Sequence, residues 1–285
     1  MTTDGEVDDR DSMTRLLMMA NEWEIEGLMY SSSQSHWLGR EWAGVEWIQG
    51  KIAAYERDYP NFRKHADGYP TPEELMSKVF VGNISNTAEM ERLTPGAEHI
   101  AEVLLDDKPG PVYLQAWGGP CTIAKALSII QKEHPDQIEK VIKKAVLYLI
   151  SDQDGTFRNY IEPNWPKLTV LLNSGQFGVF AYGARNNPQP FRTFFERPWM
   201  EGYITTGRGA LAGSYEGDKG AFSIGRGLAV VPAPGGRWSA QHRGSDLGWL
   251  GRTFRSGKTG LECVGFAGRR HPGKTDLAVR HGRPV

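Results

Sequence analysis

The chain has 285 residues, with 33 Lys and Arg against 34 Asp and Glu, and 39% of its residues are hydrophobic. This predicts one large domain, or a domain plus a fragment, with a sizeable core. No run approaches the roughly 18 apolar residues of a membrane span. The only two cysteines, Cys121 and Cys263, indicate no disulfide framework, and C-x-x-C and H-E-x-x-H zinc motifs are absent.

An acidic segment opens the chain, with Asp4, Asp8 and Asp9 in a D-x-x-x-D-D arrangement. Apolar residues at helical spacing follow, which predicts a helix over 12–24. Two interpretations remain open. The carboxylates form an N-terminal helix turn, stabilised by the helix dipole, or they supply oxygen ligands to a hard cation such as Ca²⁺.

A short buried strand is expected over 25–30, and the polar run SSSQSHW follows it at 31–37. Loops at the carboxyl ends of such strands commonly build active sites. Gln34 is therefore a candidate ligand contact, and His36 with Trp37 could form a stacking wall. An ordinary polar loop with a packed tryptophan is the alternative.

The remaining elements alternate between helical and strand patterns, as in an α/β fold whose mostly parallel sheet has helices on both faces. Thr71 is expected to cap a helix that begins at Pro72. The expected helices cover 40–57, 72 onward, 94–105 and 138–144, and the expected strands cover 111–116, 145–150 and 168–172.

Three loops lie at the ends of these elements. The glycine-rich loop 117–124 leads from a strand into a helix and lets the backbone approach a ligand closely. The segment Asp152-Gln153-Asp154-Gly155 can bind a cation or a sugar, or form a simple turn. The turn at 205–209 is not a phosphate-binding Walker A loop, since the G-K-[ST] is missing.

The segment TTDGEVDD at 2–9 resembles the D-[TC]-D-P-G-x-D-D signature of nucleoside hydrolases. Together with SSSQSHW, LQAWGGP, ISDQD and TTGRGALAG in that order, it makes residues 1–222 resemble a bacterial nucleoside-hydrolase-like family known as cellulose-binding. The resemblance implies a Rossmann-like α/β fold. It also implies an apolar strand before Thr2, which we expect to be missing, and an export signal that would suggest an extracellular or periplasmic protein.

The resemblance further implies a Ca²⁺ site held by Asp4, Asp9 and the backbone carbonyl of Trp117. Asp4 would also be the catalytic general base, and the sugar hydroxyls would be held by Asp8, Gln34 and Asn159. The family's usual Pro-Gly is Gly5-Glu6 here, which adds a charge beside the expected metal.

Two functions follow from this resemblance. The first is Ca²⁺-dependent hydrolysis of an N-ribosyl or related glycosidic bond. The second is non-catalytic binding of cellulose or another glycan, to which Trp37, Trp42 and Trp165 could contribute. The expected partner is a nucleoside or a glycan, with no nucleic acid and no membrane, and a homo-oligomer stays open.

Residues 223–285 differ from the rest, with 11 Lys and Arg against 3 Asp and Glu. They could form a disordered basic tail that binds nucleic acid. We favour a frameshift near Phe222, because codons for 246–252 read one base later permit Thr-Trp-Gly-Gly-Trp-Gly-Gly, which resembles the family's W-G-G-W-G-G element. The chain would then lose a further metal-ligand Asp, for which Asp218 is a poor substitute, and would be weakened or inactive.

Overall fold

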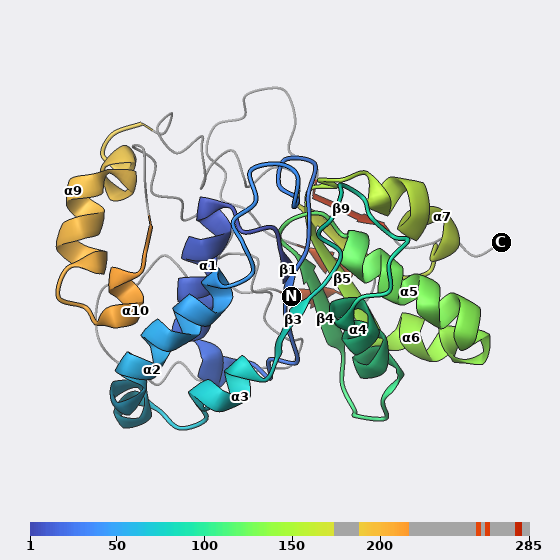
Figure 1. Ribbon diagram of the computed structural model, residues 1–285, viewed down its shortest axis with the longest axis horizontal. Coiled ribbons are helices and arrows are strands. Elements are labelled where there is room, and N and C mark those ends of the chain that lie inside the picture. The colour runs from blue at the N-terminus through green and yellow to red at the C-terminus, as the bar shows by residue number, and fades with distance from the viewer. Residues whose placement is uncertain (174–187, 217–254, 258–259, 263–276, 281–285) are drawn as a thin grey trace.

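A sheet of six parallel strands in the order β3-β2-β1-β4-β5-β6 forms the centre of the fold. The computed structural model describes residues 1–173, 188–216, 255–257, 260–262 and 277–280 (Figure 1). The strand order reverses between β1 and β4, as in doubly wound folds, which bind ligands outside the carboxyl ends of the strands at this point. The parallel strands are β1 (Thr2–Thr3), β2 (Leu28–Tyr30), β3 (Val79–Val81), β4 (Val112–Ala116), β5 (Ala145–Ile150) and β6 (Thr169–Asn173).

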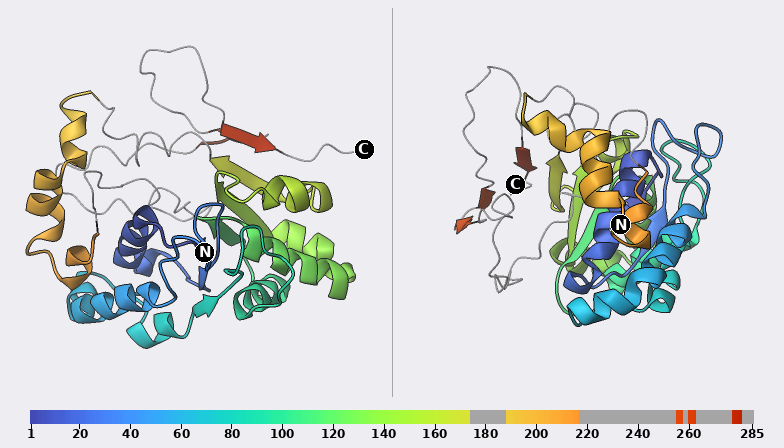
Figure 2. Two further views of the ribbon diagram at one scale, coloured as in Figure 1. Left: turned by 45° about the horizontal axis from the view of Figure 1, so that its top comes forward. Right: turned by 90° about the vertical axis from the view of Figure 1, so that its left-hand side faces the viewer.

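Helices cover both faces of the sheet, with α1 to α3 on one side and α4 to α6 on the other (Figures 1 and 2). The α-helices are α1 (Val7–Met18), α2 (Trp47–His65), α3 (Pro72–Met76), α4 (Pro95–Leu105), α5 (Cys121–Glu133), α6 (Ile138–Lys144), α7 (Glu162–Asn164), α9 (Arg197–Met200) and α10 (Ala210–Gly213). Shorter 3-10 and π turns are η1 (Ala20–Glu22), η2 (Pro135–Gln137), η3 (Phe157–Ile161), η5 (Phe191–Phe195) and η6 (Glu201–Thr205).

Each face of the sheet carries its own apolar core, because successive side chains of a strand point to opposite faces. On β5, Leu147 and Leu149 pack with α4, α5 and α6. Tyr148 and Ile150 pack with α1 and α2 on the other face. The α/β prediction with a mostly parallel sheet is confirmed.

The N-terminal elements correct the sequence analysis. Thr2 and Thr3, expected to lie in a loop without a strand, form β1 between β2 and β4. Helix α1 begins at Val7 rather than at residue 12, so Asp8 and Asp9 occupy its first turn. The two interpretations of the acidic segment therefore overlap, since these carboxylates lie both at a helix start and at a strand end.

Several element boundaries elsewhere follow local signals closely. Helix α6 and strand β5 have the bounds predicted for them. Thr71 caps α3 through a reciprocal pair, in which Thr71 Oγ1 accepts from the Glu74 backbone N–H at 3.1 Å and Glu74 Oε2 accepts from the Thr71 N–H at 2.6 Å. The prediction of a helix at 40–57 is wrong in its bounds, because α2 runs from Trp47 to His65 and includes Pro60.

The C-terminal residues are described only in part. Strand β9 (Leu277–Arg280) pairs antiparallel with β6 at the edge of the sheet, and β7 (Arg255–Gly257) pairs with β8 (Gly260–Glu262). The W-G-G-W-G-G argument at 246–252 and Asp218 lie outside the described residues. The domain boundary at 222 and the frameshift therefore stay predictions.

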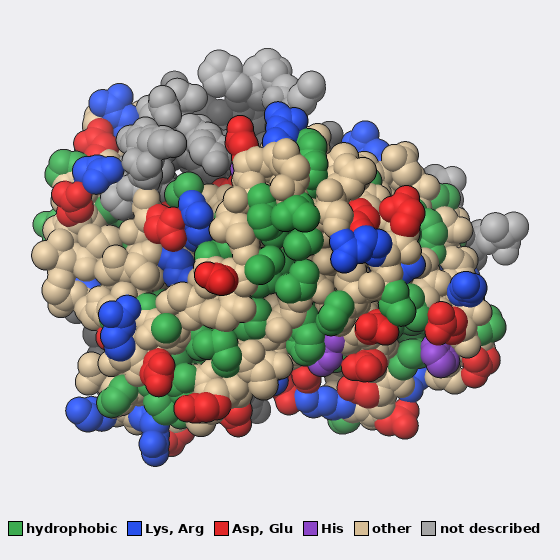
Figure 3. All heavy atoms as spheres, viewed as in Figure 1, with side chains coloured by type: hydrophobic (Ala, Val, Ile, Leu, Met, Phe, Trp, Pro, Cys, Tyr) green, Lys and Arg blue, Asp and Glu red, His purple; other side chains and the backbone are tan. Residues whose placement is uncertain are grey.

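Among the described helices, none combines the length and hydropathy that crossing a membrane requires. The face in Figure 3 carries interspersed acidic and basic side chains around a band of hydrophobic ones. Among the residues that the structure describes, that face has no continuous basic surface of the kind typical of nucleic-acid binding.

Candidate functional site

The acidic loop between β1 and α1 places Asp4 directly at the carboxyl end of the central strand. Asp9 closes this loop from the first turn of α1. Its Oδ2 accepts hydrogen bonds from Thr3 Oγ1 at 2.7 Å, from the Asp4 backbone N–H at 3.2 Å and from the Gly5 N–H at 3.3 Å. Gly5 has a positive φ of 79°, which glycine adopts without strain. The loop conformation is thus fixed by its own sequence.

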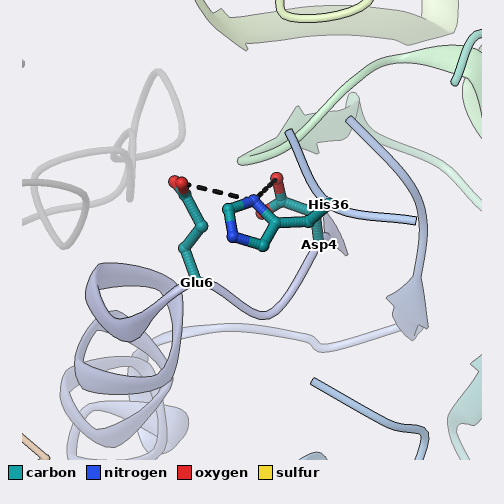
Figure 4. Close-up of side chains that lie close together, drawn as sticks. All are labelled: Asp4, Glu6 and His36. Atoms are coloured by element: carbon teal, nitrogen blue, oxygen red, sulfur yellow. Dashed lines mark ion pairs between the residues drawn. The ribbon is translucent and has the colours of Figure 1, made fainter. Parts of the chain in front are cut away.

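Asp4 lies beside Glu6 and His36, and the three offer ligand atoms within 4.8 Å of one another (Figure 4). His36 Nδ1 is 3.7 Å from Asp4 Oδ2 and 3.3 Å from Glu6 Oε1. On its other side, His36 Nε2 is 3.7 Å from Glu41 Oε2. Carboxylate and imidazole groups at these distances form an arrangement that can hold a divalent cation.

The glycine loop after β4 forms the second wall of the site. The Trp117 backbone N–H donates to the Thr2 carbonyl at 3.0 Å, which continues the pairing of β4 with β1. A Cβ on Gly118 would lie 2.8 Å from both Cβ and Cγ of Asp4, so only glycine allows this approach. The Trp117 carbonyl, an expected Ca²⁺ ligand, accepts from Gln153 Nε2 at 2.5 Å.

The Asp152-to-Gly155 segment forms hydrogen bonds with the glycine loop and stabilises its conformation. Asp154 accepts from the Cys121 N–H at 3.1 Å and from the Thr156 N–H at 2.8 Å, and burial raises the pKa of its carboxyl group. Asp152 accepts from the backbone N–H groups of Phe157 and Arg158 at the start of η3. Of the alternatives for this segment, the contacts favour a turn that joins β5 to the glycine loop.

The other predicted sugar contacts lie at different depths. Asp8 is buried in α1, whereas the Gln34 side chain is exposed, and the Gln34 backbone N–H donates to the Gln153 carbonyl at 3.0 Å. Asn159 is exposed on η3, where its Nδ2 would be 3.2 Å from a Cβ on Gly155. Their roles toward a sugar stay predictions.

Glu6 and His36 are the members of this candidate site that sequence reasoning did not consider as cation ligands. The sequence does contain a signal for Glu6, because Gly5-Glu6 replaces the Pro-Gly of the related signature and so adds a carboxylate next to the expected metal. His36 was considered only as a stacking residue, because its separation from Asp4 in the sequence hides their contact. Neighbouring strands bring the two loops together at one edge of the sheet.

The loop after β1 and the first two turns of α1 concentrate buried carboxyl groups. Asp4, Asp8, Asp9 and Asp11 are each at most 1% exposed. Burial raises the pKa of Asp11 to about 7, although its hydrogen bond from the Glu216 N–H and the nearby Lys51 oppose this. Buried carboxylates are costly unless cations or hydrogen bonds compensate them, so a cation held here would offset part of that cost.

Cys121 at the start of α5 is expected to resist thiol reagents. Burial raises the pKa of its thiol to about 11, so the reactive thiolate is scarce at pH 8. In a Cys263→Ser background, alkylation at pH 8 should be at least about 100-fold slower in native than in urea-unfolded protein. The native rate should keep rising with pH toward 11. Equal rates in both states would contradict the buried placement.

Comparison with known proteins identifies the family. Residues 1–246 match the family model described as cellulose-binding Sde182, nucleoside hydrolase-like domain. The chain belongs to this family. Together with the Asp4 loop at the switch point, this membership confirms the resemblance that the N-terminal signature indicated.

Among solved structures, the chain is similar to a nucleoside hydrolase-related hypothetical protein from Saccharophagus degradans that is associated with carbohydrate metabolism. The two share 27% sequence identity with a TM-score of 0.66, over 80% of this chain and 52% of the other. The chain therefore spans about half the length of that protein. No curated protein matches the chain.

Proposed function

We propose that this family member is a cation-dependent hydrolase that cleaves an N-ribosyl or related glycosidic bond. The observation that carries the proposal is the group of Asp4, Glu6 and His36 at the carboxyl end of β1. This is the switch point of the sheet, where doubly wound folds bind their ligands. Membership of a nucleoside hydrolase-like family supports the same chemistry.

The donor atoms fit a divalent cation and bear on its identity. Asp4 and Glu6 offer the hard oxygens that Ca²⁺ prefers, whereas the His36 imidazole suits Mn²⁺ or Zn²⁺ better. The predicted ligand Asp9 already accepts three hydrogen bonds through Oδ2. We therefore assign the cation to Asp4 and Glu6 first, with Ca²⁺ as the leading candidate. When bound, the cation would supply Lewis acidity and a fixed anchor for sugar hydroxyls.

The protein's own groups would perform the remaining steps. Asp4 would accept the proton of the attacking water as general base. Asp8, Gln34 and Asn159 would hold the sugar hydroxyls. The surrounding carboxylates would stabilise the positive charge that develops on the sugar ring as the glycosidic bond breaks.

Glycan binding without turnover is the second candidate function. A cluster of exposed aromatic side chains favours it. Phe191 and Phe194 are 43% exposed and Tyr203 is 61% exposed. The ring centroid of Trp199 lies 5.3 Å from that of Phe194 and 5.2 Å from that of Tyr203. These residues lie around α9 at the outer end of the molecule (Figure 1). Exposed apolar patches of this kind commonly mark interaction sites.

Sugar release after cation removal separates the two candidates. The full chain would be treated with EDTA, dialysed, and resupplied with Ca²⁺, Mn²⁺ or buffer alone. Nucleosides, a nitrophenyl riboside and cello-oligosaccharides are then offered. We expect free sugar to appear with cation and its rate to fall by about 100-fold or more without it, since such ions supply several kcal/mol. Cation-independent retention on cellulose without released sugar would instead support the binder.

A further inference from the structure

Gln153 connects loops that follow three strands of the sheet. Its side-chain Nε2 donates to the Trp117 carbonyl after β4 at 2.5 Å and to the Ile150 carbonyl at the end of β5 at 3.0 Å. Its own backbone carbonyl accepts from the Gln34 N–H, in the loop after β2, at 3.0 Å. Since β1 lies between β2 and β4, Gln153 links the two loops that flank the loop of Asp4.

The two aspartates beside Gln153 hold it in this position. Asp152 accepts from two backbone N–H groups at the start of η3, and Asp154 accepts from the Cys121 N–H at the start of α5. Ser151, where the chain leaves β5, has a positive φ of 64°, which residues other than glycine rarely adopt. The middle residue of the Asp-Gln-Asp sequence is thus fixed by its neighbours, and its polar groups contact loops of the candidate site.

The Trp117 carbonyl belongs to the peptide that precedes the contact with Asp4. Trp117 is fully buried, and a Cβ on the next residue, Gly118, would lie 2.8 Å from Asp4. The resemblance to nucleoside hydrolases implies that this carbonyl is a Ca²⁺ ligand. A carbonyl oxygen can accept a hydrogen bond and still bind a cation, because it has two lone pairs. Groups that hydrogen-bond a ligand in this way orient it and contribute to metal affinity.

We propose that Gln153 is a positioning residue of the candidate site, whose side-chain amide orients the Trp117 carbonyl toward a cation held by Asp4 and Glu6. This inference rests on the cation-dependent function proposed above, and it gives the Asp-Gln-Asp segment a role in that function. Both side-chain partners of Gln153 are carbonyls, which only accept hydrogen bonds, so the role requires the amide N–H groups of glutamine.

Gln153→Met tests the proposal, because methionine has a similar length and no N–H to donate, while the backbone bond to Gln34 remains possible. The matched control is Gln131→Met, which removes the hydrogen bond from Tyr160 at the end of α5 away from the glycine loop. Both variants of the full chain should lower Tm by roughly 2–5 °C. Calorimetric titration with Ca²⁺ should show binding weakened by about 10–100-fold in Gln153→Met and unchanged in the control.

The Trp117 carbonyl can also be observed directly. Trp117-Gly118 is the only Trp-Gly pair in the sequence. Labelling tryptophan carbonyl carbons with ¹³C and glycine nitrogens with ¹⁵N therefore gives a single one-bond NMR cross-peak. In the unmodified protein this peak should shift as Ca²⁺ is added. In Gln153→Met it should be displaced before any cation is added and should need about 10–100-fold more Ca²⁺ to saturate.

Two results would overturn the proposal: equal Ca²⁺ affinity of Gln153→Met and Gln131→Met, or a Trp117 peak of the unmodified protein that ignores saturating Ca²⁺. In both cases Ca²⁺ binding by the unmodified protein would still support the cation-dependent function. An unmodified protein that binds no divalent cation would refute that function and this inference together. Should Gln153→Met fail to fold, the Gln153 side-chain amide signal of the unmodified protein decides, since it should shift together with the Trp117 peak and an unaffected signal would contradict the proposal.

Discussion

Asp4→Asn is expected to weaken divalent-cation binding by about 100-fold or more and to abolish sugar release. Loss of a residue that only orients a metal ligand already costs about 10–100-fold. Asp4 is buried at the carboxyl end of β1 and lies beside both Glu6 and His36, so it is central to the group of candidate ligands. Isothermal titration with Ca²⁺ and Mn²⁺ would give the affinities, and sugar release would be assayed in parallel.

Glu41→Gln is the matched control for this variant. It removes the same unit of charge beside the same histidine, with Glu41 Oε2 at 3.7 Å from His36 Nε2, but its side chain is 74% exposed. We expect cation affinity to change by less than about threefold, as for exposed ion pairs. If Asp4→Asn bound cations as tightly as this control does, the assignment of the site to Asp4 would be wrong.

Gly118→Ala is expected to destabilise the protein by about 2–3 kcal/mol and to weaken the candidate site at the same time. The new methyl group would lie 2.8 Å from Cβ and Cγ of Asp4 and 3.2 Å from its backbone nitrogen. Asp4 cannot move away easily, because it is buried and its backbone N–H donates a hydrogen bond to Asp9 Oδ2. Overpacking of this kind typically costs about 1–3 kcal/mol. Urea unfolding and cation titration would measure both effects.

Gly50→Ala offers the opposite expectation with the same chemical change. Gly50 lies within α2, and a Cβ there would meet nothing within 4 Å. Alanine should stabilise the helix by about 0.5–1 kcal/mol and leave cation binding unchanged. If both alanine variants were equally stable, the close approach of the glycine loop to Asp4 would be incorrect.

The sequence alone determined several local elements and the acidic character of the loop that carries Asp4. The run Ala145–Ile150 is a strand and Ile138–Lys144 a helix in the structure, because hydrophobic periodicity fixes both within a few residues. The Thr71 cap likewise depends only on neighbours in the chain. The nucleoside-hydrolase signature placed Asp4 in the candidate site before any strand order was known.

Only the tertiary structure decided which groups meet Asp4. His36 reaches it because β1 and β2 are neighbours in the sheet, and Gly118 reaches it because β4 lies on the other side. The early start of α1 depends on Asp9 turning back to bond the loop. Periodicity reports which face of an element is apolar, but contacts between distant loops depend on strand order and register. These are set by packing across the whole sheet, which no local pattern encodes.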